Sequence, residues 1–280
     1  MFPATLRPSL MRLSLLLATF ASLGAATATA QRRPDTVFLE DLTWDEIRDL
    51  QKAGTRTVIV GTAGQEQKGP HMVMGEHKYV LTWTTEKIAR AVGKALVAPI
   101  ITYVPEGSWE NPRGHMAMAG TITLPEDRFK ELLTHTAKSL KAGGFTHIIL
   151  IGDSGGNQRG MSDVATALNA EWAGSAKVHF IGDYYTKAGE DMRKWLNGQG
   201  FTTEQIGSHA GMLDTSELMY VNAKLLRPDK FAMNGGFQGS GVSGDPTKAS
   251  AKIGQGLLKI KIDNAVAQIR ASMAAAGQED

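Results

Sequence analysis

The amino-acid sequence predicts an α/β protein, a three-layer α/β/α sandwich with a mostly parallel central sheet. Two observations carry this prediction. Short apolar runs alternate along the chain with longer segments of helical pattern, which is typical of a sheet covered on both faces by helices. Two of these runs, at 57–61 and 147–152, are continuous and end in glycine. Such runs indicate parallel strands that are buried on both faces.

The elements follow from local signals. Thr43 and Glu46 have the spacing of a capping box, which predicts a helix at 44–52. Pro125 stands where a helix loses no needed hydrogen bond, at the start of a helix that ends at Gly143. The expected elements are a helix at 44–52, a strand at 57–61, a helix at 79–93, strands at 95–101, 147–152 and 177–181, and helices at 125–142, 161–172, 214–226 and 249–275.

The chain has 280 residues, no internal repeat and no low-complexity linker. These features predict one domain at 31–280, and the 42% hydrophobic content is enough for a sizeable core. Because the chain has no cysteine, disulfides, thiolate metal ligands and a cysteine nucleophile are excluded. Thirty basic and 28 acidic residues give a net charge of +2. This balance argues against nucleic acid as a partner.

The first 30 residues have the pattern of a signal peptide. Arg7 and Arg12 precede an apolar run at 13–23, and a small-residue stretch ends in Ala28-Thr29-Ala30. We expect cleavage after Ala30 and export to the periplasm or the medium, with no membrane attachment afterwards. An uncleaved membrane anchor is the alternative.

Polar residues gather in three loops, at 61–77, 152–158 and 208–216. The first two follow predicted strands, and ligands of open α/β sheets bind beyond the carboxyl ends of strands. The glycine-rich loop at 152–158 lacks both G-x-G-x-x-G and G-K-[ST], which argues against a nucleotide. A site where these loops converge is therefore expected to bind another kind of small molecule.

The same loops carry a resemblance to the creatininase family. Residues 66–77, EQKGPHMVMGEH, resemble the family's Glu-Gln-His-Gly-Pro-His-Leu-Pro-Leu-Gly-Thr-Asp. Residues 152–157, GDSGGN, resemble Asn-Gly-His-Gly-Gly-Asn, and residues 209–216, HAGMLDTS, resemble His-Ala-Gly-x-x-Glu-Thr-Ser. The resemblance runs from about Leu42 to Leu258 with the motifs in order. It implies a creatininase-like fold, hydrolysis of cyclic or linear amides, one or two divalent ions (commonly zinc or manganese), and often a hexamer.

The resemblance also assigns roles to positions, several of which are altered. The family's first glutamate ligand is Glu66, its next histidine ligand is Lys68, and its bridging aspartate is His77. Its glycine-loop histidine is Ser154, and its carboxylate after His-Ala-Gly is Asp214. The proton-transfer histidine of the family is unchanged, as His209.

An ammonium group has no lone pair, so Lys68 cannot bind a metal while it is protonated. It could instead take the position of one cation, which indicates a one-metal or metal-free site rather than a two-metal site. We predict that one zinc or manganese ion is held by Glu66, His77, Asp153 and Asp214. A competing interpretation is that Asp153 only pairs with Lys68.

The expected substrate contacts come from the same loops, where glycines let backbone amides approach a ligand closely. His115 belongs to a glycine-flanked segment, and His71 could also simply orient its loop. Three other histidines, His135, His147 and His179, have no motif and are interpreted as structural. The predicted substrate-binding residues are His71, His115, Ser154, Gly155, Gly156 and Asn157.

Together these observations predict a metal-dependent hydrolase that cleaves a C–N bond of a small amide, cyclic or linear. In this hypothesis His209 moves the proton, and Lys68 polarises the carbonyl or holds an anionic group of the substrate. Two alternatives stay open. One is a non-catalytic ligand-binding protein on the same scaffold, motivated by the altered ligand positions, and the other is a lactone hydrolase.

Overall fold

A computed structural model describes residues 33–231 and 239–277 of the chain. The predicted signal peptide and its cleavage after Ala30 lie outside the described residues, so export stays a prediction, as does the hexamer. Among the described helices, none combines the length and the apolar character that a membrane span requires.

The central sheet has four strands, all parallel, in the order β2-β1-β3-β4. The strands are β1 (Thr57–Thr62), β2 (Ala95–Val97), β3 (His147–Gly152) and β4 (Lys177–Phe180). In the central pair, Thr62 lies opposite Gly152, so the carboxyl ends of β1 and β3 are level. The chain therefore leaves both strands at one edge of the sheet, where their polar loops begin.

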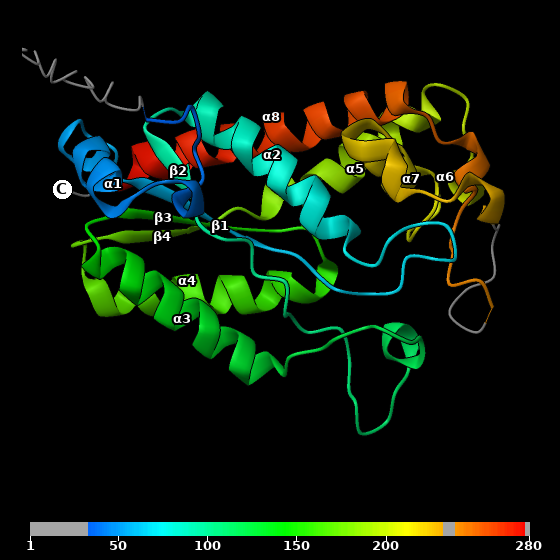
Figure 1. The fold of residues 1–280 in the computed structure, drawn as a ribbon, viewed down its shortest axis with the longest axis horizontal. Helices are drawn as coiled ribbons and strands as arrows, with labels where there is room; N and C mark the ends of the chain where they lie inside the picture. Colours follow the sequence, from blue (N-terminus) through cyan, green and yellow to red (C-terminus); the bar gives the residue numbers. More distant parts are fainter. Residues whose placement is uncertain (1–32, 232–238, 278–280) are drawn as a thin grey trace, which may run out of the picture. The chain divides into compact units, whose positions relative to one another are not determined.

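Alternating side chains of the strands pack into two separate hydrophobic cores, one on each face of the sheet. Val58 and Ile148 belong to the core on one face, and Ile59 and Ile149 to the core on the other. Figure 1 shows α3 and α4 on one side of the sheet and α2 and α8 on the other. These four helices are α2 (Glu76–Val92), α3 (Glu126–Ala142), α4 (Gln158–Trp172) and α8 (Ala251–Ala276). The predicted three-layer α/β/α sandwich with a parallel sheet is confirmed.

Most predicted elements are present, with shifted ends. Helix α1 (Trp44–Lys52) has the predicted bounds, and its Thr43–Glu46 capping box forms. Strand β2 is shorter than predicted because Pro99 has no N–H to donate to a ladder, although the Ile101 N–H still donates to the Gly61 carbonyl at 2.9 Å. Helices α2 and α4 each begin three residues before the predicted start.

The third polar loop leads into a group of helices that the sequence predicted only in part. Helix α7 (Met212–Asn222) begins two residues before the predicted start and is followed by a short 3-10 turn at Ala223–Leu225. Helices α5 (Thr186–Asn197) and α6 (Thr203–Ile206) were not predicted. The sequence did carry a signal for α5, since its buried residues Ala188, Met192 and Leu196 recur every four residues, as on one face of a helix.

Helices α7 and α8 pack closely at Gly254. A Cβ atom on Gly254 would lie 1.9 Å from the Ser216 carbonyl oxygen. We therefore expect Gly254→Ala to lower the free energy of unfolding by about 1–3 kcal/mol, despite the better helix propensity of alanine, because the two backbones must separate. Gly189→Ala in α5 is the matched control, since a Cβ there meets nothing within 4 Å, and it should stabilise by about 0.5–1 kcal/mol. Urea denaturation measures both, and equal signs would contradict this account of the packing.

Candidate functional site

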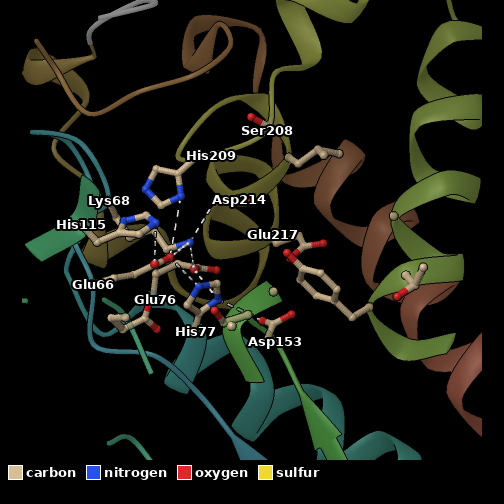
Figure 2. Close-up of a pocket in the computed structure, with 18 of the residues that line it drawn as sticks. Glu66, Lys68, Glu76, His77, His115, Asp153, Ser208, His209, Asp214 and Glu217 are labelled. Atoms are coloured by element: carbon tan, nitrogen blue, oxygen red, sulfur yellow. Dashed lines mark hydrogen bonds and ion pairs between the residues drawn. The ribbon is translucent and has the colours of Figure 1, made fainter. Parts of the chain in front are cut away.

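The polar loops meet at the carboxyl edge of the sheet around a cavity of about 840 Å³ (Figure 2). This volume is in the range of sites for small molecules. The predicted site residues that line it are Glu66, Lys68, His77, His115, Asp153, Ser154, Gly155, Gly156, His209 and Asp214.

Two predicted substrate-binding residues, His71 and Asn157, do not line this cavity. Both are fully buried. The His71 Nε2 atom lies 3.0 Å from Thr215 Oγ1, and Asn157 Nδ2 donates to the Thr62 carbonyl at 3.1 Å. They hold loops together behind the cavity wall, which for His71 is the alternative that its sequence left open.

Lys68 lies at the centre of the cluster and is 1% exposed. Its Nζ atom is 3.1 Å from Glu66 Oε1, 3.2 Å from Glu76 Oε2 and 3.1 Å from Asp214 Oδ2. Burial alone would lower the pKa of Lys68, but the three carboxylates hold its pKa well above the ordinary value. An ammonium group has three N–H donors, and here three carboxylates surround it. Lys68 thus neutralises carboxylates, and the geometry does not support its predicted role of polarising a substrate carbonyl.

A second buried ammonium belongs to Lys261 of α8. Its Nζ atom donates to Asp153 Oδ1 at 2.8 Å and to Glu217 Oε2 at 2.7 Å. Burial opposes its charge, but these two carboxylates hold the pKa of Lys261 well above its usual range. Asp153 therefore pairs with Lys261, and the interpretation that it pairs with Lys68 is wrong.

His77 contacts two carboxylates that pair with Lys68 and one that pairs with Lys261. Its Nε2 atom is 2.8 Å from Glu66 Oε1, and its Nδ1 atom is 3.2 Å from Glu76 Oε2 and 3.5 Å from Asp153 Oδ2. Burial and Lys68 would lower the pKa of His77, but the surrounding carboxylates outweigh both and raise it well above the ordinary value. This ring position therefore attracts positive charge.

His115 and His209 stand on the other side of Glu66, with ring centroids 4.6 Å apart. The His115 Nε2 atom is 3.1 Å from Glu66 Oε2, and the His209 Nδ1 atom is 3.7 Å from Glu66 Oε1. The His209 Nε2 atom lies 2.7 Å from the Gln67 carbonyl, an acceptor, so Nε2 carries the proton. Burial and then the charge of Lys68 lower the pKa of His209 to about 4. His209 is therefore neutral at pH 7.

Glu106 completes the wall beside Glu66. Burial, and then the negative charge of Glu66, raise the pKa of Glu106 to about 9. Burial would also raise the pKa of Glu66, but Lys68 and His77 hold it well below its usual range. Of these two adjacent carboxyl groups, Glu66 is charged and Glu106 is protonated at neutral pH.

The raised pKa of Glu106 predicts a pH dependence of stability. Its folded-state pKa of about 9 is above the reference value of 4.5, so this group's contribution is fully present below about pH 4.5 and is lost as the pH rises toward 9. Metal-free protein should have a lower Tm at pH 9 than at pH 6. The difference should shrink in Glu106→Gln and remain in the control Glu131→Gln, which changes an exposed carboxylate. An unchanged difference in Glu106→Gln would contradict the assignment.

The four predicted metal ligands do not surround a single point. Asp214 Oδ2 accepts from the Ala210 N–H at 2.8 Å and faces Lys68. In the part of the chain that the structure describes, two groups of three potential ligand atoms lie within 4.8 Å of one another, and Asp214 belongs to neither. The groups are Glu66, His115 and His209, and Glu76, His77 and Asp153.

The arrangement does not fit a centre with two divalent ions at the positions that the resemblance implies. Lys68 already neutralises Glu66 and Asp214 on one side, and Lys261 neutralises Asp153 on the other. Ser154 replaces a histidine ligand and has only a neutral hydroxyl to offer. Each of the two groups of three donor atoms has the chemistry to hold one ion of zinc or manganese.

The cavity residues that were not predicted from the sequence include four buried ionisable ones: Glu76, Glu106, Glu217 and Lys261. Glu217 follows Asp214 by three residues and so shares its helix face. Lys261 falls on the apolar stripe of α8, between Leu258 and Ala265, and a lysine on such a stripe signals a buried charge partner. Glu76 stands beside His77 inside the motif at 66–77. We find no comparable signal for Glu106.

A family model described as "Creatininase: Creatinine amidohydrolase" matches residues 40–269. A 3-dehydro-scyllo-inosose hydrolase of Thermotoga maritima is 26% identical over 125 residues, which are 44% of this chain and 37% of that protein. This chain thus matches little more than a third of that hydrolase. A mycofactocin precursor peptide peptidase of Mycobacterium ulcerans is 23% identical over 251 residues, covering 76% of this chain and 84% of that protein.

Solved structures share the fold. One described as "Creatininase Mn" has a TM-score of 0.71 and 21% identity, and the match covers 85% of this chain and 98% of that one. A creatininase variant described as the Zn-Zn type has a TM-score of 0.68 and 20% identity, covering 85% and 99%. A putative creatinine amidohydrolase from Bacteroides fragilis has a TM-score of 0.65 and 15% identity, covering 84% and 95%.

Proposed function

Because this chain belongs to the creatininase family, whose model matches residues 40–269, we propose that it hydrolyses a C–N bond in a small amide. The observation that carries the proposal is a neutral histidine, His209, on the wall of a cavity of about 840 Å³ beside a charged carboxylate, Glu66. Solved structures with this fold are described as manganese and zinc-zinc creatininases, and the cavity has donor groups for such an ion.

His209 is suited to move the proton. With Nε2 bound to the Gln67 carbonyl, Nδ1 is the atom that takes a proton from the attacking water. Glu66, 3.7 Å from Nδ1, stabilises the imidazolium that forms. As the C–N bond breaks, the same proton passes from Nδ1 to the leaving nitrogen, which yields an amine and a carboxylic acid and restores neutral His209.

The carbonyl oxygen gains negative charge when water attacks. Ser154, Gly155 and Gly156 line the cavity directly before helix α4. The N-terminus of a helix carries a partial positive charge and unpaired backbone N–H groups, which favour an oxyanion. A bound divalent ion would supply a water whose pKa is lowered toward neutrality.

Turnover of a substrate panel tests the proposal. The panel contains small cyclic amides, linear amides and lactones, and assays of purified protein supplied with Zn²⁺ or Mn²⁺ follow release of amine or acid. We expect turnover of amides that disappears after chelation. Turnover of lactones alone would replace the proposal with the lactone hydrolase, and saturable ligand binding without turnover would replace it with a binding protein.

The binding protein is the second candidate because of one specific observation. Two buried ammonium groups, those of Lys68 and Lys261, neutralise carboxylates of the cavity without any metal. Such a site can stay folded and bind a small molecule without an ion. For this candidate, Glu66→Ala would leave ligand affinity nearly unchanged, whereas in the hydrolase it would impair turnover.

A further inference from the structure

We propose that Glu76, His77 and Asp153 form the binding site for a single divalent transition-metal ion, with a ligand set that differs from the one the creatininase resemblance implies. The inference deepens the proposed function and rests on it for the use of the ion in hydrolysis. Binding of the ion itself can be measured without any substrate.

The spacing of the three donor atoms matches one coordination sphere. His77 Nδ1 lies 3.2 Å from Glu76 Oε2 and 3.5 Å from Asp153 Oδ2, and all three atoms lie within 4.8 Å of one another. Ligands that bind one tetrahedral zinc ion at about 2.0–2.1 Å are separated from each other by about 3.3 Å. The atoms therefore stand about as far apart as ligands of one ion.

The three atoms are also buried and lack well-aligned hydrogen bonds. Glu76 is 1%, His77 8% and Asp153 2% exposed. Glu76 Oε2, His77 Nδ1 and Asp153 Oδ2 make no well-aligned hydrogen bond. Their contacts are ion pairs with one another and, for Glu76 Oε2, with Lys68 Nζ at 3.2 Å. One cation at their meeting point would satisfy all three.

Contacts on the far side of His77 and Asp153 fix the orientation of these two ligands. His77 Nε2 is 2.8 Å from the ionised Glu66, so Nε2 keeps its proton. A metal-binding histidine is ordinarily held by a carboxylate in this way. Carboxylates raise the pKa of His77, so a bound ion takes the place of the second proton, on Nδ1. Lys261 holds the other oxygen of Asp153 at 2.8 Å.

The net charge of the carboxylates and lysines in the cluster is negative, which favours binding of a divalent cation. The lysines contact five carboxyl groups. Burial raises the pKa of Glu217 to about 8, so this group is largely protonated at pH 7. The other four give −4 when all are ionised and the two lysines add +2, so −2 remains when His77 is neutral, and a divalent ion balances it. The five carboxyl groups are Glu66, Glu76, Asp153, Asp214 and Glu217.

The second group of potential ligands, Glu66, His115 and His209, is less suitable for a metal because both carboxylate oxygens of Glu66 already have partners. Oε1 is 2.8 Å from His77 and 3.1 Å from Lys68, and Oε2 is 3.1 Å from His115. A metal at Glu66 would disrupt its contacts with both His77 and Lys68, whereas a metal at Glu76 Oε2 would disrupt the contact with Lys68 alone. One imidazole and two carboxylates, by contrast, suit zinc, manganese or iron(II).

The test is metal binding by chelator-treated full-length protein, measured by equilibrium dialysis against Zn²⁺ and Mn²⁺. We expect about one equivalent in the wild type and at least a tenfold weaker affinity in His77→Gln and in Asp153→Asn. Matched substitutions in the same cavity, His209→Gln and Asp214→Asn, should still bind one equivalent with affinity within about threefold of wild type. Less than a tenth of an equivalent in the wild type would overturn the proposal.

Crystals of the wild type soaked in Mn²⁺ or Zn²⁺ keep the proposal testable if a variant fails to fold. An anomalous peak among Glu76, His77 and Asp153 is expected, and a peak beside His115 and His209 would overturn the assignment. Because neither measurement uses a substrate, a protein that binds the ion here without turnover would refute the hydrolase alone.

Discussion

Lys261→Met is expected to lower the free energy of unfolding by about 3–5 kcal/mol. The substitution removes a buried ammonium that lies 2.8 Å from Asp153 Oδ1 and 2.7 Å from Glu217 Oε2. The methionine side chain is of similar length, so the packing changes little. The loss comes mainly from the buried carboxylate of Asp153, which is left without its cation.

Lys259→Met is the matched control, two residues earlier in the same helix. The Lys259 side chain is 73% exposed and pairs with Asp263 on the helix surface, whereas the Lys261 side chain is 8% exposed. An exposed pair of this type contributes about 0.5 kcal/mol or less. Urea denaturation at pH 7 measures both variants. A difference between them of less than about 1 kcal/mol would show that the ion pairs of Lys261 contribute little.

A second substitution separates charge from packing. Asp153→Asn combined with Lys261→Met removes the carboxylate that loses its cation, whereas Glu217, whose pKa burial raises to about 8, is largely protonated at pH 7. The double variant is therefore expected to be more stable than Lys261→Met alone. If the double variant is no more stable, the loss in Lys261→Met comes from altered packing of α8.

His209→Gln is expected to reduce kcat by about 10²–10⁴-fold on any amide that the wild type hydrolyses. Glutamine can still donate to the Gln67 carbonyl, 2.7 Å from His209 Nε2 in the wild type, but it cannot take up a proton. The loss should appear in kcat more than in KM. In the wild type kcat/KM should fall below about pH 4, where His209 becomes protonated, and the variant should lack this acid limb.

His179→Gln is the control for this prediction. Burial, followed by the charge of His147, lowers the pKa of His179 to about 4 as well, but this ring lies in β4, with Nδ1 2.6 Å from Ser272 Oγ. It does not line the cavity, and kcat is expected to remain within about twofold of the wild type. A kcat for His209→Gln within tenfold of the wild type would remove His209 from the mechanism.

The elements that the sequence predicted best are those with a strong local period. The strands at 57–61 and 147–152 are continuous apolar runs, and only strands covered on both faces tolerate such runs. Both are present as central strands of the sheet. Helix α5 was not predicted, although its three buried residues recur every four positions, and it has no side-chain cap at Tyr185 to mark its start, unlike the capping box of α1.

For the candidate site, the sequence predicted which loops converge but not how their charges pair. Asp153 pairs with Lys261, 108 residues further along the chain, and no motif links these two positions. Glu66 and Asp214 do come together as predicted, yet the cation between them is the Lys68 ammonium. The sequence predicted residues of the correct chemical types for a metal site. Only the structure shows which of them form ion pairs and which lie together as potential metal ligands.

The sequence by itself determined the fold class, the three loops of the cavity and the creatininase family. These properties follow from periodicity and from short motifs, which residues close together in the chain express. Only the tertiary structure decided that two lysines lie among the carboxylates and that Glu76, His77 and Asp153 point at one another. Ion pairs and coordination depend on distances of about 3 Å between side chains, and distant segments reach such distances only when the packing of the helices against the sheet is complete.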